Sequence, residues 1–305
     1  MINKQKKLPQ RMLVFSEVSR RGSFTEAADV LGLTKSGVSQ YVSQLEAELG
    51  VQLLTRTTRR LVLTQAGLMF VERCRQLENL LDLTVDEIEE REGRPKGPLS
   101  ITAPHALAPS IIIPAIGNLV DEFPGLEPRI LIDDRPSNIV DQGIDLAIRV
   151  GDLEDSTLRA RLLGEQHNIL VASPSYLANN PSPKNLSELS EHPFIATSWQ
   201  QGRQQRLLDD KKVYDIALKP KFRVNTAVTA AQLATAGKGF ALLPNLYLVE
   251  LLAAGQLVRI LPQIRTPARL INSVHSYRGD VPLKVRRCID LIKSRLEQFS
   301  EYKTE

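Results

Sequence analysis

The fold of the N-terminal part of this chain is decided by residues 22–67, GSFTEAADVLGLTKSGVSQYVSQLEAELGVQLLTRTTRRLVLTQAG. Residues 23–26, SFTE, form a capping box, because the serine hydroxyl and the glutamate carboxylate can satisfy free amides at a helix start. The helix that begins there ends before Gly32-Leu33-Thr34, where glycine permits a sharp turn and Thr34 can cap a further helix from Lys35 to Leu49. Two helices joined by so short a turn pack closely only through small residues, and the Ala27–Ala28 pair meets that need. The stretch therefore predicts a helix-turn-helix.

The helix from Lys35 to Leu49 has a polar face that its packing does not need. The small core is expected to close around Leu31, Leu33, Val38 and Val42. The other face carries short or flexible hydrogen-bonding side chains, which suit base edges and phosphates in the major groove. The predicted DNA-binding residues of the helical part are Ser23, Thr25, Thr34, Lys35, Ser36, Ser39, Gln40 and Ser43.

An amphipathic helix precedes this motif and a basic hairpin follows it. Apolar residues recur at steps of three and four between Leu8 and Val18, which predicts a helix from Leu8 to Arg20. Residues 51–54 and 60–63 are expected to be short strands on either side of TRTTR at 55–59. A basic hairpin beside a recognition helix meets the DNA backbone or the minor groove. This wing adds Arg56, Thr58 and Arg59 to the predicted DNA-binding residues.

The charge distribution indicates a basic head on a near-neutral body. Residues 1–65 carry ten Lys or Arg against five Asp or Glu, whereas the rest of the 305 residues is nearly balanced. This asymmetry is typical of a protein that binds phosphates through one domain and is regulated through another. A globular protein of more than one domain fits the length and the 42% hydrophobic content. Without a bilayer-spanning apolar stretch or a secretory signal, a cytoplasmic protein with no membrane partner is expected.

A long helix without proline follows the wing, from Gln65 to Glu92. Its apolar stripe repeats in alternating steps of four and three, as a heptad seam does, through Phe70, Cys74, Leu77, Leu81, Thr84 and Ile88. Either the same helix of a second copy or the chain's own domain can cover this stripe. Pairing with a second copy would place two recognition helices on two half-sites of an operator.

The dense pattern of residues 22–67 resembles the DNA-binding region of LysR-type transcriptional regulators, through its alanine pair, its glycine turn, VSQ at 38–40, LEAELG at 45–50 and its arginine-rich wing. Two positions depart from the family: Ser43 stands where Lys or Arg is frequent, and Leu54 where Phe is usual. The first departure puts one phosphate contact in doubt. The resemblance implies a sequence-specific regulator that binds double-stranded operator DNA as a homodimer through the linker helix, or as a homotetramer. It also implies a small-molecule effector and RNA polymerase as partners.

Beyond residues 93–98, GRPKGP, which we expect to be a hinge, short β-rich runs alternate with helical stretches in an α/β pattern. Three segments resemble the effector domain of the same family, which is similar to the two-lobed periplasmic binding proteins: residues 141–165, 170–177 and 233–262. We therefore expect an α/β protein overall, in three parts. They are a winged helix-turn-helix at 1–65, a dimerisation linker helix at 66–92 and an effector domain at 93–305, with one lobe at about 97–171 and 268–305 and the other at about 172–267.

Carried over by position, the family's effector cleft would be bordered by Thr102, Ala103, Pro104, His105, Arg149, Val150 and Gly151 from the first lobe, and by Trp199, Thr226 and Pro244 from the second. Arg149 indicates either a carboxylate ligand or a structural ion pair with Asp145 or Asp152. Trp199 either stacks on a ligand or packs in the core, and His105 is as a rule a surface or satisfied histidine rather than a ligand contact.

The sequence contains no HExxH, CxxC, Walker or GxSxG motif, and Cys74 and Cys288 lack the spacing of a zinc site, so neither an enzyme nor a cofactor nor a metal is predicted. Three alternatives remain: a plain helical bundle at the N-terminus, an enzyme built from scattered Ser, His and Asp, and an architectural DNA binder whose large domain only oligomerises. A thermal shift with a metabolite and a sequence preference on DNA would separate the regulator from these.

Overall fold

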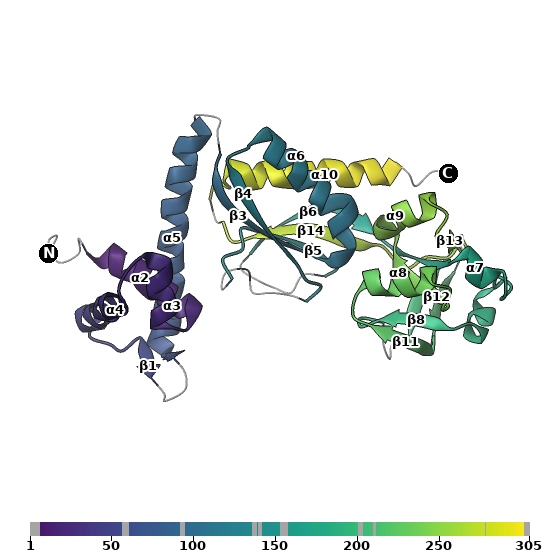
Figure 1. Cartoon of the computed structure of the whole chain (residues 1–305), viewed down its shortest axis with the longest axis horizontal. Coiled ribbons are helices and arrows are strands. Elements are labelled where there is room, and N and C mark those ends of the chain that lie inside the picture. Colours follow the sequence, from purple (N-terminus) through teal and green to yellow (C-terminus); the bar gives the residue numbers. More distant parts are fainter. Residues whose placement is uncertain are drawn as a thin grey trace. The chain divides into compact units, whose positions relative to one another are not determined.

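A computed structural model describes residues 7–56, 61–91, 95–135, 139, 142–152, 158–200, 204–209, 212–277 and 279–301. The chain forms two compact units (Figure 1). One unit comprises Met1–Arg94 with Val140–Gly143 and Gly279–Pro282, and the other comprises Pro95–Ile139, Ile144–Arg278 and Leu283–Glu305.

The first unit is a set of helices with a two-stranded wing. The helices are α2 (Leu8–Arg21), α3 (Phe24–Leu31), α4 (Lys35–Leu49) and α5 (Gln65–Arg91), and β1 (Leu54–Arg56) pairs antiparallel with β2 (Leu61–Leu63). Gly32 ends α3 at a φ of 62°, a left-handed conformation that lets the chain turn at once into α4. The predicted order of helix, turn, helix and wing is confirmed.

The core of this unit lies between α2, α3, α4 and the start of α5, around Phe15, Val38 and Leu45. The prediction that Leu33 belongs to this core is wrong, because its side chain is 38% exposed. Leu33 sits in the turn, where its amide donates to Ala28 O at 3.0 Å and completes the last turn of α3. The first wing strand also begins later than predicted, since Leu53 bonds to α4 and to Thr64 instead of to a strand.

The apolar stripe of α5 divides into two parts. Phe70 and Cys74 pack in the core of the unit, with the Phe70 ring 5.8 Å from that of Phe15. Farther along the helix, Leu80 and Leu81 are 61% and 44% exposed. The reading in which the chain's own domain covers the stripe is therefore right for the first part of the helix, while these two leucines farther along are exposed. The side chain of Ile88 lies outside the described residues.

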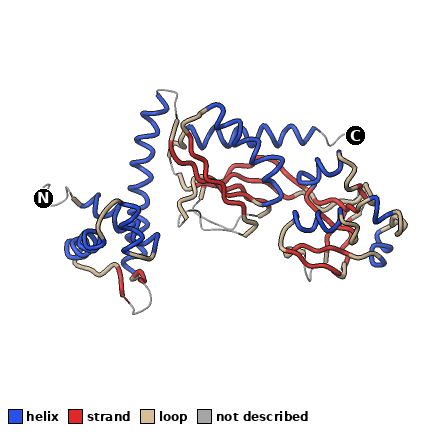
Figure 2. The backbone as a smooth tube through the Cα atoms, viewed as in Figure 1, coloured by secondary structure: helices blue, strands red, loops and turns tan. Residues whose placement is uncertain are grey.

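The second unit contains two mixed five-stranded sheets (Figure 2). The first has the order β4-β3-β5-β14-β6 and consists of Leu126–Ile132, Gly97–Ala103, Leu146–Val150, Arg269–His275 and Arg159–Gln166. The chain leaves β3 through two short helical turns, η1 (His105–Leu107) and η2 (Ala108–Ile112), and then enters α6 (Ile113–Glu122), which packs beside α10 (Leu283–Glu301). Gly97 and Pro98, predicted as part of a hinge, lie inside β3, while residues 92–94 fall outside the described part.

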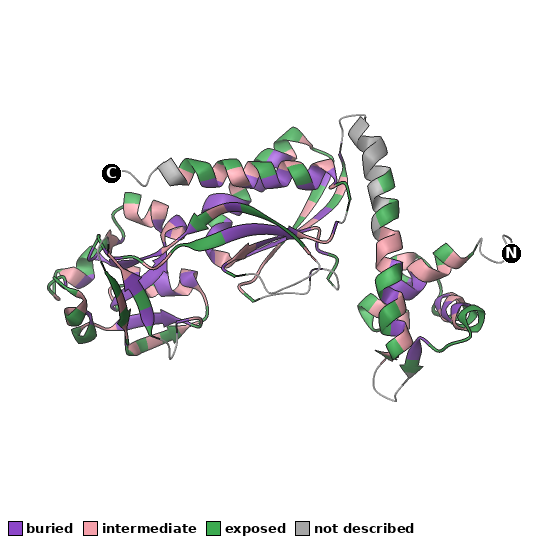
Figure 3. Cartoon of the chain, turned by 180° about the vertical axis from the view of Figure 1, so that it is seen from behind, coloured by how far each residue is buried: buried purple, intermediate pink, exposed green. Residues whose placement is uncertain are grey.

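The second sheet has the order β11-β8-β12-β7-β13 and consists of Pro220–Val224, Phe194–Thr197, Phe240–Pro244, Asn168–Ala172 and Val258–Arg259. Alternate residues of β7 face opposite sides, as in any strand. Ile169 and Val171 pack under α8 (Ala227–Thr235) and α9 (Asn245–Ala253). Leu170 and Ala172 join a core on the other side, which is covered by α7 (Pro174–Leu177), η3 (Leu186–Glu191) and the hairpin of β9 (Gln205–Leu208) and β10 (Val213–Ile216). Figure 3 shows the buried strand centres between these layers.

The chain crosses between the sheets at two adjacent points. One is His167, between β6 and β7, and the other follows Thr266, ahead of β14. The crossings are bonded to each other, because Asn168 N donates to Thr266 Oγ1 at 2.8 Å and Thr266 N donates to Asn168 O at 3.0 Å. Since β7 pairs with β12 and β13, the predicted lobe boundary at residue 171 falls inside a strand of the second sheet, and the crossing comes earlier.

Candidate nucleic-acid interface and effector cleft

The recognition face predicted on α4 is exposed. Val38, Val42 and Leu45 bury the opposite side of the helix in the core. On the free side, Lys35, Ser36, Gln40 and Ser43 are exposed and Ser39 is half-buried. The helix thus presents a contiguous polar face to an external partner.

The hydroxyl groups of Ser23 and Thr34 cap the helices that begin after them. Thr34 Oγ1 accepts a hydrogen bond from Gly37 N at 3.1 Å and lies 3.1 Å from Ser36 Oγ, while Ser23 Oγ accepts from Glu26 N at 3.4 Å. These bonds satisfy amides that a helix start otherwise leaves unpaired. Thr25 is exposed in the first turn of α3.

The wing is held to α4 by a residue that sequence reasoning missed. Glu46 Oε1 accepts hydrogen bonds from the amides of Leu53 and Leu54 at 2.8 and 3.1 Å. At the other end of the wing, Thr64 N donates to Leu53 O at 2.9 Å, and Gly67 lies so close that a Cβ there would overlap with the same carbonyl oxygen. The backbone of Arg56 lies in β1, whereas Thr58 and Arg59 fall outside the described residues.

Several cations of the basic head are engaged within the unit. Arg11 pairs with Glu48 and donates to Gln44 Oε1 at 3.1 Å, which ties α2 to α4. The buried carboxylate of Glu17 forms ion pairs with Arg20 at 2.6 Å and with Arg21 at 2.8 Å. The charge available to a phosphate backbone is therefore smaller than the composition alone implies. Lys35 is exposed on α4 and makes no ion pair within the described ranges.

Four of the predicted cleft residues of the first lobe lie at the end of β3 or directly after it. Thr102 and Ala103 are buried at the end of the strand, and Pro104 precedes η1. His105 N donates to Asp134 Oδ1 at 3.0 Å, and its Nδ1 lies 3.4 Å from Asp134 Oδ2. The next residue, Ala106, is buried in the core of the second lobe. The segment after β3 thus joins the two lobes at the position where the cleft was predicted.

Arg149 and Gly151 lie at the end of β5. Burial lowers the pKa of the Arg149 guanidinium, and the charge of Asp133 opposes this shift in part. The Asp145 carboxylate accepts from Ser100 N at 2.7 Å and from the Tyr277 hydroxyl at 2.9 Å. Both roles of Arg149, a contact to a carboxylate ligand and an ion pair with Asp145 or Asp152, stay predictions. Gly151 has a φ of 99°, and a Cβ there would overlap with the guanidinium of Arg269, which donates to Val150 O at 3.2 Å.

The residues predicted from the second lobe take packing and capping positions. Trp199 packs partly buried against the core that also contains Ala106 and Ala227. The Thr226 hydroxyl caps α8 by accepting from Thr229 N at 3.1 Å. Pro244 is buried at the end of β12, paired with Asn168. Trp199 therefore packs around the same core as Ala106, which follows His105, and Ala227, which follows Thr226.

Two further features are absent from the part of the chain that the structure describes. No three His, Cys, Asp or Glu side chains gather there in a way that could hold a metal ion. Among the same residues, no helix has the length and apolar character to cross a membrane.

Known proteins match both parts of the chain. Residues 9–68 match the family described as "Bacterial regulatory helix-turn-helix protein, lysR family", and residues 92–297 match the "LysR substrate binding domain". The HTH-type transcriptional regulator PtxR of Pseudomonas aeruginosa is 32% identical over 290 residues, 93% of this chain and 92% of that protein. The HTH-type transcriptional activator AaeR of Escherichia coli is 30% identical over 282 residues, 92% of this chain and 91% of that protein.

Solved structures of full-length proteins are also similar. The Vibrio cholerae virulence activator AphB has a TM-score of 0.59 at 26% identity, over 93% of this chain and 98% of that chain. The regulator CrgA of Neisseria meningitidis has a TM-score of 0.61 at 28% identity, over 94% of this chain and 98% of that chain. The chain therefore belongs to the LysR family of transcriptional regulators, with a helix-turn-helix DNA-binding domain and an effector-binding domain, and it is a regulator and not an enzyme.

Proposed function

We propose that this regulator binds operator DNA with the exposed face of α4 in the major groove and the wing against the backbone or the minor groove. The observation that carries the proposal is the polar face of α4, which points away from the core and which the fold itself does not require. Gln40 lies at its centre as a base-reading side chain, and Lys35 supplies a phosphate contact. Ser23, Thr25, Thr34, Ser36, Ser39 and Ser43 surround it, and Arg56, Thr58 and Arg59 extend the interface into the wing.

The operator-bound form is a homodimer that pairs through α5, in the cytoplasm. Support comes from the exposed leucines Leu80 and Leu81, which the chain's own domain does not cover. A two-fold pair of α5 helices buries such side chains and presents two recognition helices to two half-sites. Pairing between effector domains then extends the dimer to a tetramer, which meets RNA polymerase at the promoter.

A small molecule bound between the lobes controls this assembly. The proposed contacts are Thr102, Ala103, Pro104, His105, Arg149, Val150 and Gly151 on one side and Trp199, Thr226 and Pro244 on the other. The partly buried guanidinium of Arg149 suits a carboxylate, because desolvation strengthens its attraction for an anion. Since two bonded crossings connect the lobes, closure on a ligand changes how the effector domains pair and alters the half-site spacing.

The DNA proposal is tested with genomic fragments that the purified full-length protein selects at low ionic strength. Fluorescence anisotropy then compares the best fragment with a shuffled duplex for the wild type, Gln40→Ala and the control Gln256→Ala, an exposed glutamine of the second unit. We expect Gln40→Ala to lose about 1–3 kcal/mol on the selected fragment and little on the shuffled duplex, with the control unchanged. Equal losses on both duplexes, or no loss at all, would refute the assignment of Gln40 as a base-reading residue.

A further inference from the structure

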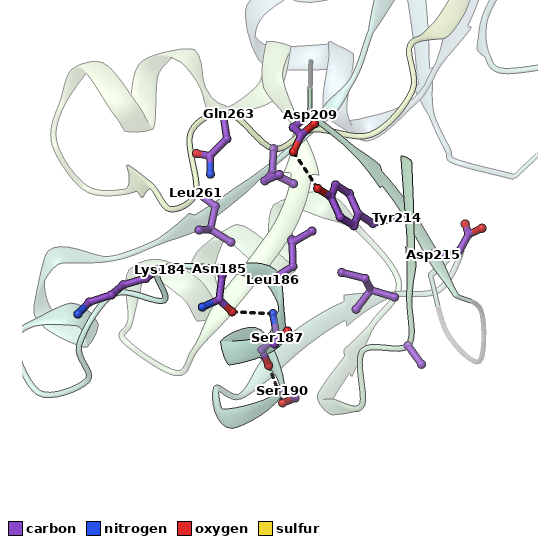
Figure 4. Close-up of a pocket in the computed structure, with 13 residues that line it drawn as sticks. Lys184, Asn185, Leu186, Ser187, Ser190, Asp209, Tyr214, Asp215, Leu261 and Gln263 are labelled. Atoms are coloured by element: carbon purple, nitrogen blue, oxygen red, sulfur yellow. Dashed lines mark hydrogen bonds between the residues drawn. The ribbon is translucent and has the colours of Figure 1, made fainter. Parts of the chain in front are cut away.

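A pocket of about 710 Å³ lies within the second lobe, away from the residues proposed for the cleft (Figure 4). Three segments form it: residues 184–190 at η3, the hairpin of β9 and β10, and the turn that includes Leu261, Gln263 and Ile264. None of the predicted cleft residues lines it. Its volume is within the range of about 300–1,000 Å³ that small-molecule sites occupy.

One part of the pocket wall is apolar. Leu261 and Ile264 are buried in the core on this side of the second sheet, and Leu186 and Ile216 pack partly buried against the same core. Figure 4 shows Leu186 and Leu261 between the polar side chains that surround them. A ligand with an aromatic or aliphatic body can exclude water from this surface.

The polar rim is held in place by hydrogen bonds of its own. Asn185 Oδ1 accepts from Ser187 N at 3.0 Å, and Ser190 Oγ donates to Ser187 O at 2.9 Å. On the hairpin, the Asp209 carboxylate accepts from the Tyr214 hydroxyl at 3.0 Å and from Lys212 N at 2.8 Å. Because these groups are fixed before a ligand arrives, binding costs little ordering of the rim.

The turn in the wall is strained. Leu261 has a φ of 47°, and within the described residues it is the one non-glycine residue with a positive φ. Its carbonyl accepts from Ile264 N at 2.8 Å, which keeps the turn closed. Backbone strain of this kind concentrates at ligand-binding positions.

The charge of the pocket selects the ligand's head group. Asp215 pairs with Arg206 at 3.1 Å, and Figure 4 shows Asp215 and Lys184 directed away from the apolar wall. Asp209 instead lies next to the Tyr214 ring at one edge of the pocket. The hydrogen bond to Asp209 raises the pKa of Tyr214, so its hydroxyl stays protonated and donates to the Asp209 carboxylate. An anion is disfavoured at this edge and a cation is attracted.

We propose that this pocket is a second ligand site of the protein, beyond the effector cleft, and that it takes a small amphipathic amine. The apolar body of the amine lies against Leu186 and Leu261, and its ammonium group lies at Asp209. The turn in the wall leads through Arg265, which bonds to Leu208, to the crossing at Thr266. An occupant of the pocket therefore contacts the turn that leads into the segment connecting the lobes.

The test compares three probes with one body and different heads: 2-phenylethylamine, 2-phenylethanol and phenylacetate. Calorimetric titration of the full-length protein near pH 7 is expected to give an amine affinity about fivefold above that of the alcohol, the size of one partly screened ion pair, with phenylacetate weakest. Hydrogen exchange with the amine is expected to slow at residues 184–190, 212–216 and 261–264.

Two variants and a control decide the outcome. Asp209→Asn keeps the shape of the side chain and should abolish the preference for the amine over the alcohol. Ala217→Phe fills the pocket from an exposed lining position and should weaken both probes, whereas Asp121→Asn, an exposed carboxylate on α6, should change neither. The proposal is overturned if phenylacetate binds as tightly as the amine, or if both variants bind the amine like the wild type. It is also overturned if the amine slows hydrogen exchange at residues 102–105 instead of at the pocket. DNA binding is not involved, so this result is independent of the operator proposal.

Discussion

Glu46 is the residue through which α4 fixes the wing, and Glu46→Ala should release it. The carboxylate accepts two amide hydrogen bonds, at 2.8 Å from Leu53 N and 3.1 Å from Leu54 N. Leu53 and Leu54 are only 1% and 9% exposed, so their amides are poorly placed to find water instead. A hydrogen bond to a charged group contributes about 1.5–3 kcal/mol, and partial access of water to a half-buried site reduces the sum. We expect a loss of about 3 kcal/mol from the first unit.

Glu46→Gln is the matched control, because the amide oxygen of glutamine still accepts at the same position. A neutral hydrogen bond is about half as strong as a charged one, so the loss should be about 1–2 kcal/mol. The two units need not unfold together, and calorimetric scans should therefore be resolved into separate transitions. The transition temperature of the first unit should fall from the wild type to Glu46→Gln and further to Glu46→Ala, while that of the second unit stays constant.

The same variants should act on DNA through the wing. A released wing loses phosphate contacts, which weakens binding to all sequences alike and lowers the dependence of affinity on salt. Amide exchange at Leu53 and Leu54 should accelerate in Glu46→Ala. If Glu46→Ala unfolds within about 0.5 kcal/mol of the wild type, or if these two amides remain protected, then the wing is held by something other than Glu46.

Three further predictions follow from packing and burial. Gly67→Ala should destabilise the first unit by about 3 kcal/mol or more, because its Cβ would overlap with Leu53 O. Gly117→Ala, with open space around it on α6, should instead stabilise the second unit by about 0.5–1 kcal/mol. Calorimetry on the two variants would contradict this if both transitions shifted in the same direction. Thr34→Ala should cost about 1 kcal/mol by removing the cap at Gly37 N, measured by urea unfolding, and Thr34→Ser should recover most of it. Burial raises the pKa of Cys74 and Cys288 from 9.0 to about 12, so iodoacetamide at pH 8 should label them only after unfolding, as mass spectrometry would report. Because the folded state keeps protons that the unfolded thiols release, the contribution of the two buried thiols to stability is complete below about pH 9 and declines as the pH rises toward 12. Labelling of the folded protein at pH 8 would show that the thiols are accessible.

Helix boundaries and caps were predictable because their signals lie within a few residues of each other. Ser23 and Thr34 each accept a hydrogen bond from the amide three residues farther along, as their places in the sequence predict. Such a bond depends only on the local backbone, so no distant residue can change it. The recognition face of α4 was predictable for the same reason, since the period of the helix separates its apolar and polar sides.

Several strands escaped prediction because they are short or strongly polar. β6 (Arg159–Gln166) and β10 (Val213–Ile216) carry charged residues and sit at the edges of their sheets, where one side of the strand faces solvent. An edge strand needs little apolar patterning, since its pairing is supplied by the neighbouring strand. Sequence reasoning therefore captured only strands with a β-rich apolar run.

The sequence by itself determined the helix-turn-helix and the exposed face of α4, because short-range spacing encodes them, and the order of the two domains followed from the resemblance to the family. Only the tertiary structure decided that β7 belongs to the second sheet, that Glu46 anchors the wing, and that the stripe of α5 is partly covered within its own unit. It also assembled the amine pocket from segments far apart in the chain. The physical reason is that long-range contacts depend on how whole elements pack together, so the local sequence does not indicate them.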